Sequence, residues 1–286
     1  MTAREEPVSS PAPETSIFHK KPTPDDMLAD DTIYTLRLAT EPADILGAQR
    51  LRYLVFVEEL GASGGMIDHE RRIETDAFDA IFDHLVLIDK RIPPETGDHV
   101  VGAYRLLPCD RLPPGGRFYS EDEYDLAPLR ATGRRLLELG RTCVHPDHRG
   151  GAAMFLLWNG LAEYVLERGI EVMFGPASFH GTDVAALAKP LSWLWHNHLA
   201  PEDIRVRALE PGRAPMDLVP EDQLDRAAAM AQMPALIKAY LRLGGFVGDG
   251  AFIDRPFNTT DVCLLMDTGK MSSRHRDFYT RKQGPT

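Results

Sequence analysis

One segment restricts the possible folds more than any other: an apolar run, a proline, a glycine pair and an amphipathic stretch in succession. Residues 136–144 are rich in strand-forming side chains, and the run ends at His145-Pro146 because a residue before proline is held extended. Gly150-Gly151 forms a turn, and residues 152–168 carry apolar side chains at helical spacing. This order of strand, turn and helix presents backbone amides that can bind a phosphate, although ordinary tight turns share the Arg-Gly-Gly pattern.

The rest of the chain predicts a mixed α+β (α/β) fold. Strands and helices alternate, and Pro-rich or Gly-rich turns separate them. Residues 84–89 and 100–107 predict an antiparallel pair, whereas residues 181–219 contain several prolines and show no clear periodicity. The other strands are expected at 33–39, 136–144, 172–176, 246–253 and 262–266, and the helices at 45–56, 152–168 and 220–243.

Composition predicts one folded domain between two tails. Residues 1–28 are rich in Pro, Ser, Thr and acidic residues, a composition typical of disorder. Residues 29–270 are expected to form a single domain with an insertion at about 181–235, and residues 271–286 form a basic, flexible tail. The 286 residues are enough for a substantial core.

Charge and cysteine content exclude several classes of function. The chain has 43 Asp and Glu against 32 Lys and Arg, a net charge of −11, which disfavours nucleic acid as a partner. Three cysteines without a C-x-x-C motif argue against a disulfide framework and a zinc site, and they favour a cytoplasmic location. We also predict no metal site at His145, Asp147 and His148, since a third matched ligand is missing.

The chain shows no membrane-spanning pattern. It lacks an uninterrupted apolar stretch of 18 residues and a signal-peptide core. The segment Leu191–Trp195 is apolar and contains two tryptophans, which suits either a buried core or a lipid interface, with the core favoured. Peripheral contact with the inner membrane therefore stays open.

Two clusters of charged residues suggest chemistry. In the segment 74–79, Glu74 and Asp76 share one face of an extended backbone, so they repel each other unless a cation or a proton lies between them. Glu138 and Arg141 lie within the apolar strand, where an ion pair needs further partners to offset its desolvation. A solvated acidic loop and a structural salt bridge are the simpler interpretations of these two patterns.

Four motifs follow one another along the chain: Arg52-x-x-x-Phe56, Glu74-x-Asp76-x-x-Asp79, Arg105 within 102–108, and Glu138-x-x-Arg141. Together they resemble the GNAT N-acyltransferases that accept acyl groups from acyl carrier protein, and their order is similar to that of the acyl-homoserine-lactone synthases. Three further segments, 141–151, 175–181 and 257–262, are more similar to the L-ornithine Nα-acyltransferases of ornithine-lipid synthesis.

The resemblance implies a fold and a reaction. The fold would be a mixed, mostly antiparallel twisted sheet flanked by helices, with a central strand pair that splays apart where the first strand ends at Val144. The reaction would transfer a 3-hydroxyacyl group from acyl carrier protein to the α-amino group of L-ornithine, which gives lyso-ornithine lipid. Alternatives are an acyl-homoserine-lactone synthase that uses S-adenosylmethionine, and a non-catalytic acyl-binding module on the same fold.

The same resemblance, combined with charge complementarity, suggests roles for individual residues. Glu138, acting directly or through water, is the first candidate for the general base, and Asp76 is the second. Arg105 or Arg141 suits the substrate carboxylate. The remaining predicted site residues are Glu74, Asp76 and Asp79 for the substrate ammonium, Arg52 for substrate binding, and Val144, Arg149, Gly150 and Gly151 for the donor arm.

The expected donor is the phosphopantetheine arm of acyl carrier protein, with no tightly bound cofactor. In the usual GNAT turn, the first of two positions is glycine and the second is glycine or alanine. This chain has Ala152 and Met154 there, and their larger side chains leave less room for the pyrophosphate of coenzyme A. Acyl carrier protein is acidic, so we expect a basic docking patch. Candidates for that patch are Arg130, Arg134, Arg135 and Arg149, while the basic tail could attract anionic lipid.

Overall fold

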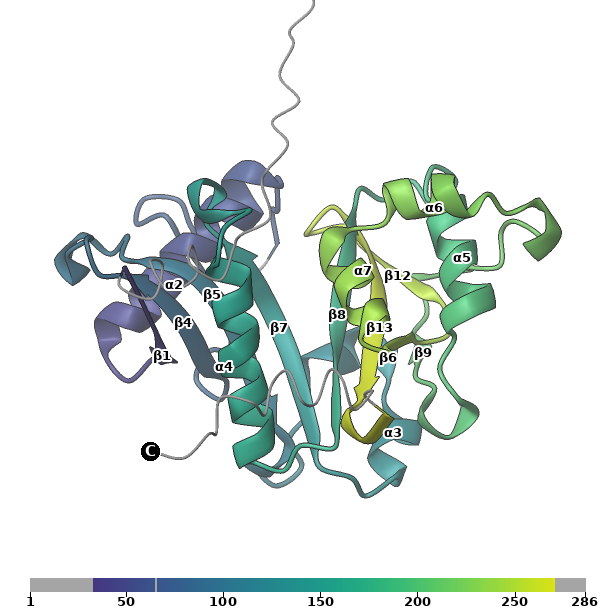
Figure 1. Ribbon diagram of the computed structural model, residues 1–286, viewed down its shortest axis with the longest axis horizontal. Coiled ribbons are helices and arrows are strands. Elements are labelled where there is room, and N and C mark those ends of the chain that lie inside the picture. Colours follow the sequence, from purple (N-terminus) through teal and green to yellow (C-terminus); the bar gives the residue numbers. More distant parts are fainter. Residues whose placement is uncertain (1–32, 65, 271–286) are drawn as a thin grey trace, which may run out of the picture.

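A nine-stranded mixed sheet runs through the computed structural model, which describes residues 33–64 and 66–270 (Figure 1). All neighbouring strands in its main path are antiparallel except β7 and β8. The GNAT-like fold expected from the sequence is therefore confirmed. In spatial order the strands are β1 (Tyr34–Leu38), β4 (Asp83–Asp89), β5 (Val100–Pro108), β7 (Leu136–Val144), β8 (Val172–His180), β13 (Thr259–Asp267), β12 (Ala251–Asp254) and β10 (Arg213–Ala214), with β11 (Phe246–Val247) beside β13.

The two parallel strands separate after three residue pairs. Leu136–Glu138 of β7 pair with Val172–Phe174 of β8, and beyond this point the strands diverge, as Figure 1 shows. Gly175 lies so close to β7 that a Cβ atom there would be 2.1 Å from the carbonyl oxygen of Leu139. The next residue, Pro176, has no N–H to donate to a neighbouring strand. The sequence Gly-Pro thus coincides with the point where the sheet opens.

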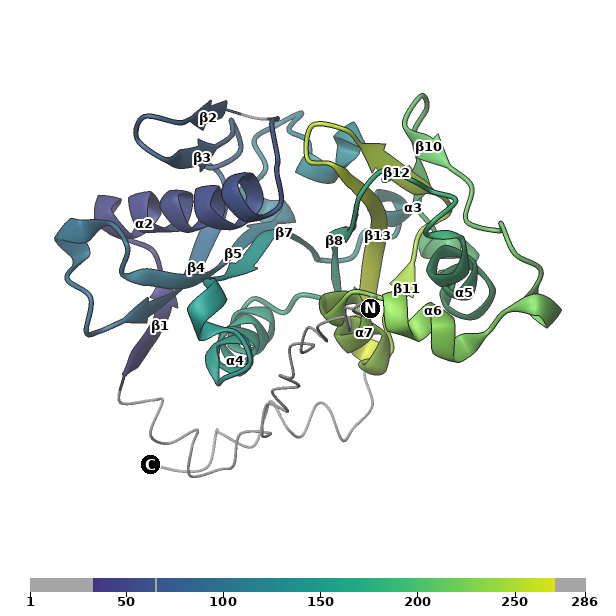
Figure 2. The same ribbon diagram turned by 90° about the horizontal axis from the view of Figure 1, so that it is seen from above.

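Helices cover both faces of the half of the sheet that β1, β4, β5 and β7 form. The helices α2 (Pro42–Arg52) and α4 (Ala153–Glu167) lie on opposite faces (Figure 2). Gly160 lets α4 approach the sheet, because a Cβ there would be 2.3 Å from Leu36. The remaining helices are α3 (Ala127–Ala131), α5 (Ala188–His198), α6 (Arg226–Gln232) and α7 (Ala235–Arg242).

Short elements frame the site described below. A π-helix, Tyr53–Glu59, continues from α2, and a 3-10 turn, Tyr119–Asp122, precedes α3. Two small antiparallel sheets complete the structure. They are formed by β2 (Met66–Asp68) with β3 (Ile73–Thr75), and by β6 (Tyr124–Asp125) with β9 (Arg207–Ala208).

The strands and helices predicted in the first half are present, but β2, β3, β6 and α3 were not predicted. In the second half, the strand predicted over 246–253 is two strands, β11 and β12. The helix predicted over 220–243 is two helices, α6 and α7, because Pro234 interrupts the backbone hydrogen bonds between them. Helix α5 lies inside 181–219, where no element was predicted. Its residues Leu191 and Leu194 are fully buried, so this segment belongs to the core as the simpler interpretation held.

The predictions on domains and tails have different outcomes. The predicted insertion at about 181–235 supplies α5, α6, β9 and β10, while the division into domains stays a prediction. The predicted tails, 1–28 and 271–286, lie outside the described residues. Within the described ranges no helix has the length and apolar character needed to cross a bilayer.

Candidate functional site

A cavity of about 930 Å³, partly open to solvent, lies where β7 and β8 have separated. Its walls come from segments that are far apart in the sequence. Strand β7 provides one side, β8 and β13 the other, and the turn after Phe118 closes one end. The lining residues are Phe56, Leu60, Ala62, Tyr119, Glu123, Gly140, Arg141, Thr142, Pro176, Ala177, Ser178, Leu236, Asp254, Phe257, Thr259 and Asp261.

Arg141 reaches this cavity because β7 contains a bulge. The pairing with β5 shifts between Ala103 and Arg105, opposite Gly140–Cys143, and Arg141 has a positive φ of 48°. A bulge redirects a side chain out of the regular alternation of a strand. The Arg141 guanidinium lies 4.9 Å from the ring centre of Tyr119 and 4.4 Å from that of Phe257. The bulge and the two aromatic rings together orient this cation.

Arg141 belongs to a network of three arginines and three carboxylates, and the other five members lie behind the cavity wall. Arg52 binds Glu74 and Asp79, and Arg105 binds Asp76 and Asp79 at 2.7 and 2.8 Å. Arg141 contacts Glu74 at 3.3 Å and Asp76 at 3.4 Å. The six predicted residues are therefore brought together, but they bind one another, and only Arg141 of the six lines the cavity.

This network keeps Asp76 and Asp79 ionised. Burial alone raises the pKa of Asp76 and Asp79, but the neighbouring arginines outweigh it and hold both pKa values below the usual range. Arg52 and Glu74 are fully buried. A substrate in the cavity could not contact Arg52 or Glu74 directly, so their predicted substrate-binding roles would act through the position of Arg141.

Glu138 is buried and does not line the cavity. Its Oε1 accepts hydrogen bonds from the backbone N–H and the hydroxyl of Ser120, and its Oε2 accepts from the N–H of Tyr119 at 2.8 Å. Burial raises the pKa of Glu138 to about 7, although the bonds from Ser120 and Tyr119 oppose this shift. Glu138 thereby fixes the turn that carries the ring of Tyr119 into the cavity wall.

The predicted phosphate-binding turn is formed, and its arginine is already paired. Arg149 donates to both oxygens of Glu59 at 2.6 Å and to the carbonyl of Val144 at 3.0 Å. Gly150 has a φ of +80°, which favours glycine, and a Cβ at Gly151 would meet nothing within 4 Å. The start of α4 has no side-chain cap, so its amides face an open glycine turn.

The prediction of one basic docking patch for acyl carrier protein is wrong, because its four arginines do not share one surface. Arg134 and Arg135 come just before β7, whereas Arg149 follows its other end, and a nine-residue strand spans roughly 26 Å. Arg130 and Arg134 also form ion pairs with Glu121 and Asp267. These arginines therefore belong to two regions of the surface.

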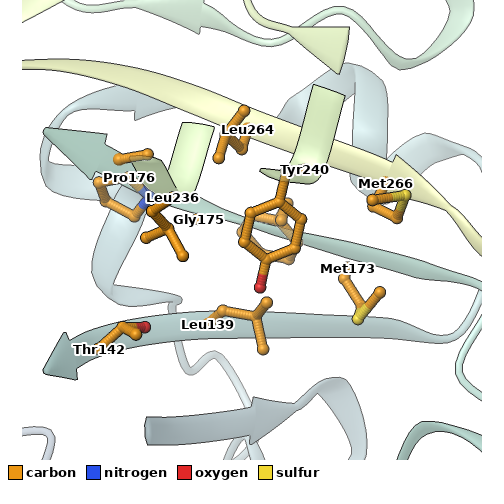
Figure 3. A pocket seen from close by; sticks show the side chains of 11 residues that line it. Leu139, Thr142, Met173, Gly175, Pro176, Leu236, Tyr240, Leu264 and Met266 are labelled. Carbon is orange, nitrogen blue, oxygen red and sulfur yellow. The ribbon is translucent and has the colours of Figure 1, made fainter. Parts of the chain in front are cut away.

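A second, apolar cavity of about 350 Å³ adjoins the first one (Figure 3). Thr142, Pro176, Ala177 and Leu236 line both cavities. The hydroxyl of Tyr240 points into the apolar cavity in Figure 3 and lies 3.4 Å from the hydroxyl of Tyr104. The remaining lining residues are Leu139, Met173, Phe174, Gly175, Leu264 and Met266.

Sequence reasoning missed three carboxylates in the charged cavity. Glu123, Asp254 and Asp261 line it, and one oxygen of each lies within 4.8 Å of the others. Asp261 belongs to the segment 257–262, which resembles the L-ornithine Nα-acyltransferases. That resemblance was the one sequence signal that could have identified Asp261 as a site residue. Glu123 and Asp254 carry no local motif, because only the folded chain places them beside β13.

Comparison with known proteins assigns the chain to a family. An L-ornithine N(alpha)-acyltransferase of Rhodobacter capsulatus is 65% identical over 256 residues, which cover 90% of this chain and 98% of the relative. The chain belongs to this family. A second L-ornithine N(alpha)-acyltransferase, of Brucella abortus, is 44% identical and covers 85% of this chain and 88% of the relative. The protein is therefore an acyltransferase.

Two further comparisons concern the fold. The model of the acetyltransferase (GNAT) domain matches residues 51–159, which include the bulged strand β7 and the start of α4. Among solved structures, a CoA-dependent acyl-homoserine lactone synthase has a TM-score of 0.48 and 16% identity, covering 87% of this chain and 88% of that chain.

Proposed function

We propose that this acyltransferase moves a long 3-hydroxyacyl group from acyl carrier protein to the α-amino group of L-ornithine and so forms lyso-ornithine lipid. One observation carries the proposal: an apolar cavity and a charged cavity share a wall where β7 and β8 separate. The lining of the small apolar cavity suits the first carbons of an acyl chain, and the charged cavity suits an amino acid. The names of the relatives support ornithine as the acceptor.

The reaction needs no acyl-enzyme, because a thioester is already activated. The α-nitrogen attacks the thioester carbonyl, a C–N bond forms and the C–S bond breaks. The acceptor's ammonium first gives up one proton, and the nitrogen loses a second proton after the attack. The departing sulfur takes up one proton as a thiol, so the reaction releases one proton overall. Donor and acceptor would meet at the shared wall of the two cavities, which contains Thr142, Pro176 and Ala177.

For the base we keep Glu138, acting through a chain of water molecules. A pKa of about 7 suits a group that accepts a proton near neutral pH. Direct contact with the acceptor is disfavoured, because Ser120 and Tyr119 occupy both carboxylate oxygens. Asp76 is the weaker candidate, since Arg105 and Arg141 hold its pKa below the usual range.

Arg141 is the best-placed residue for the acceptor's carboxylate. Its guanidinium lines the charged cavity, and it is oriented by Tyr119 and Phe257. Guanidinium groups bind carboxylates through paired N–H donors. Arg105, the alternative, lies in the network behind the cavity wall.

The donor arm would lie along the turn between Val144 and α4. Phosphopantetheine carries one phosphate, and the uncapped amides after Gly150 and Gly151 suit a single phosphate. Arg149 would then strengthen the site from its position beside Glu59. A cytoplasmic location, with possible peripheral contact at the inner membrane, fits a reaction that joins a carrier-bound acyl chain to a polar amino acid.

Product analysis tests this function. The purified protein is incubated with a 3-hydroxyacyl thioester of acyl carrier protein, or the same acyl thioester of coenzyme A, and a mixture of free amino acids. We expect mass spectrometry to show N-acylated ornithine from the carrier-bound donor. A lactone that forms only with S-adenosylmethionine would favour the synthase alternative, and an absence of thioester turnover would favour the non-catalytic module.

A further inference from the structure

Three carboxylates in the charged cavity lie close together without a direct ion pair in the described part of the chain, and Arg141 is the cation that acts on them from a distance. Glu123, Asp254 and Asp261 converge to within 4.8 Å, and all three line the cavity. Over residues 33–64 and 66–270, no lysine, arginine or histidine forms an ion pair with any of them. The carboxylates of the neighbouring network, by contrast, are each bound by arginines.

In two of these carboxylates, one oxygen also has no hydrogen-bond donor among the described residues. Glu123 Oε2 and Asp261 Oδ1 are buried, and within the described part of the chain neither atom has a hydrogen-bond partner. Both side chains are only 4% exposed. A buried carboxylate oxygen without a donor is destabilising. These two oxygens are therefore available to accept hydrogen bonds from a bound ligand.

Electrostatics agree with this geometry. Burial raises the pKa of Glu123 well above its usual value, and the charges of Asp261 and Asp254 raise it further. Burial likewise raises the pKa of Asp261 to about 6. Without a ligand, the group can lower its repulsion only by holding protons, whereas a bound cation would let all three side chains ionise.

The position of the group matches the far end of an acceptor. Amide formation takes place in the gap beside β7, whereas Asp261 lies on β13, one strand beyond β8. Adjacent strands lie about 4.8 Å apart. The two nitrogens of an extended ornithine are separated by roughly 6 Å, so its side-chain nitrogen would reach across β8 while its α-nitrogen stays at the gap.

We propose that Glu123, Asp254 and Asp261 bind the side-chain ammonium of a diamino acid acceptor, an assignment that rests on the proposed acylation of ornithine. An ammonium has three N–H donors and can serve three carboxylates at once. Arg141 provides the opposite charge in the same cavity for the acceptor's carboxylate. The cavity thus selects a molecule with one negative group and a distant positive group.

A divalent metal ion fits these residues less well. Calcium takes six to eight oxygen ligands and magnesium requires six in an octahedron. Here one oxygen of Asp254 already accepts the backbone N–H of Phe257 at 3.1 Å.

The test compares L-ornithine with L-norvaline, which has the same carbon chain without the terminal nitrogen. The ratio of their kcat/KM values is measured with carrier-bound donor for the wild type, for Glu123→Gln with Asp261→Asn, and for Glu163→Gln. Glu163 is an exposed glutamate of α4 and serves as the matched control. We expect the double variant to lower the preference for ornithine roughly 30-fold or more, mainly through KM, and the control to preserve it.

Each outcome supports or overturns the assignment. An unchanged ratio in the folded double variant would overturn it and leave ornithine acylation intact. Acylation of neither amino acid by the wild type would instead refute the proposed function. Calorimetric binding of Mn²⁺ that the double variant loses would identify a metal site and also overturn the assignment. If the double variant does not fold, the ratio for Glu123→Gln alone decides.

Discussion

At the scale of single residues, charge balance separates two kinds of carboxylate in this enzyme. Asp76 and Asp79 are paired with arginines and have lowered pKa values. Glu123, Asp261 and Glu138 are buried without a paired cation and have raised pKa values. Groups of the first kind hold Arg141 in place, and groups of the second kind are able to exchange protons or bind a cation near neutral pH.

The predicted role of Glu138 can be tested through the pH dependence of kcat. A base must be deprotonated to act, so kcat should rise with pH through about 7, the pKa that burial gives Glu138. In Glu138→Gln we expect kcat to fall roughly 10²-fold and this rise to disappear. The measurement is kcat at saturating substrates between pH 5.5 and 9, a range that extends about 1.5 to 2 pH units to either side of the pKa of Glu138.

A matched control separates chemistry from support of the turn. Glu121 lies in the same turn and binds the backbone N–H of Phe118 at 2.7 Å. Glu121→Gln should therefore weaken the turn and keep the rise of kcat with pH. If Glu138→Gln keeps that rise as well, Glu138 supports the turn and another group accepts the proton.

At the scale of elements, the separation of β7 and β8 depends on backbone contact at one position. Gly175 brings β8 against the carbonyl of Leu139, and Pro176 then offers no N–H. Beyond this point the bulge at Arg141 turns a charged side chain into the space that opens. Three local features in two strands thus create both cavities.

Gly175→Ala tests this arrangement. The added Cβ would lie 2.1 Å from the oxygen of Leu139, so β8 would have to move. We expect the free energy of unfolding to fall by about 2–3 kcal/mol in urea titrations. In Gly140→Ala, the control in β7, the added atom would meet Arg105 no closer than 3.8 Å, and we expect a change within about 0.5 kcal/mol. Equal effects of the two substitutions would contradict the close-contact explanation.

At the scale of the whole molecule, the unbalanced carboxylates should make stability depend on pH. The pKa of Asp261 is about 6 in the folded protein against a usual value of 3.8. Between these values the folded state binds more protons than the unfolded state, so this residue lowers the free energy of unfolding as pH rises from about 4 to about 7. Burial is the main cause of this raised pKa, and the neighbouring charge of Asp254 adds to it.

Asp261→Asn removes this pH dependence. Relative to the wild type, the variant should gain stability as pH rises across this interval, by up to about 3 kcal/mol, because one pKa unit corresponds to about 1.36 kcal/mol. Urea unfolding at several pH values measures the difference, with Glu163→Gln as an exposed control. A constant difference between wild type and variant would show that Asp261 ionises normally in the fold.

Much of the fold was predictable from local sequence. The run ending at His145-Pro146, the glycine turn and the amphipathic stretch after it predicted β7 and α4 almost to the residue. These elements depend on periodicity and on the backbone restrictions of Pro and Gly, which act over a few residues. Helix α5 was not predicted, because prolines obscure its pattern and burial in the core stabilises it instead.

The sequence by itself determined the strand, turn and helix over residues 136–168, the family motifs and the six charged residues that meet at the cavity wall. Only the tertiary structure decided which charges face the cavity. Arg141 does so through a bulge, while Arg52 is buried by its own partners. Glu123, Asp254 and Asp261 meet although more than 130 residues separate the first from the others. Such convergence results from the packing of distant strands, which no local pattern records.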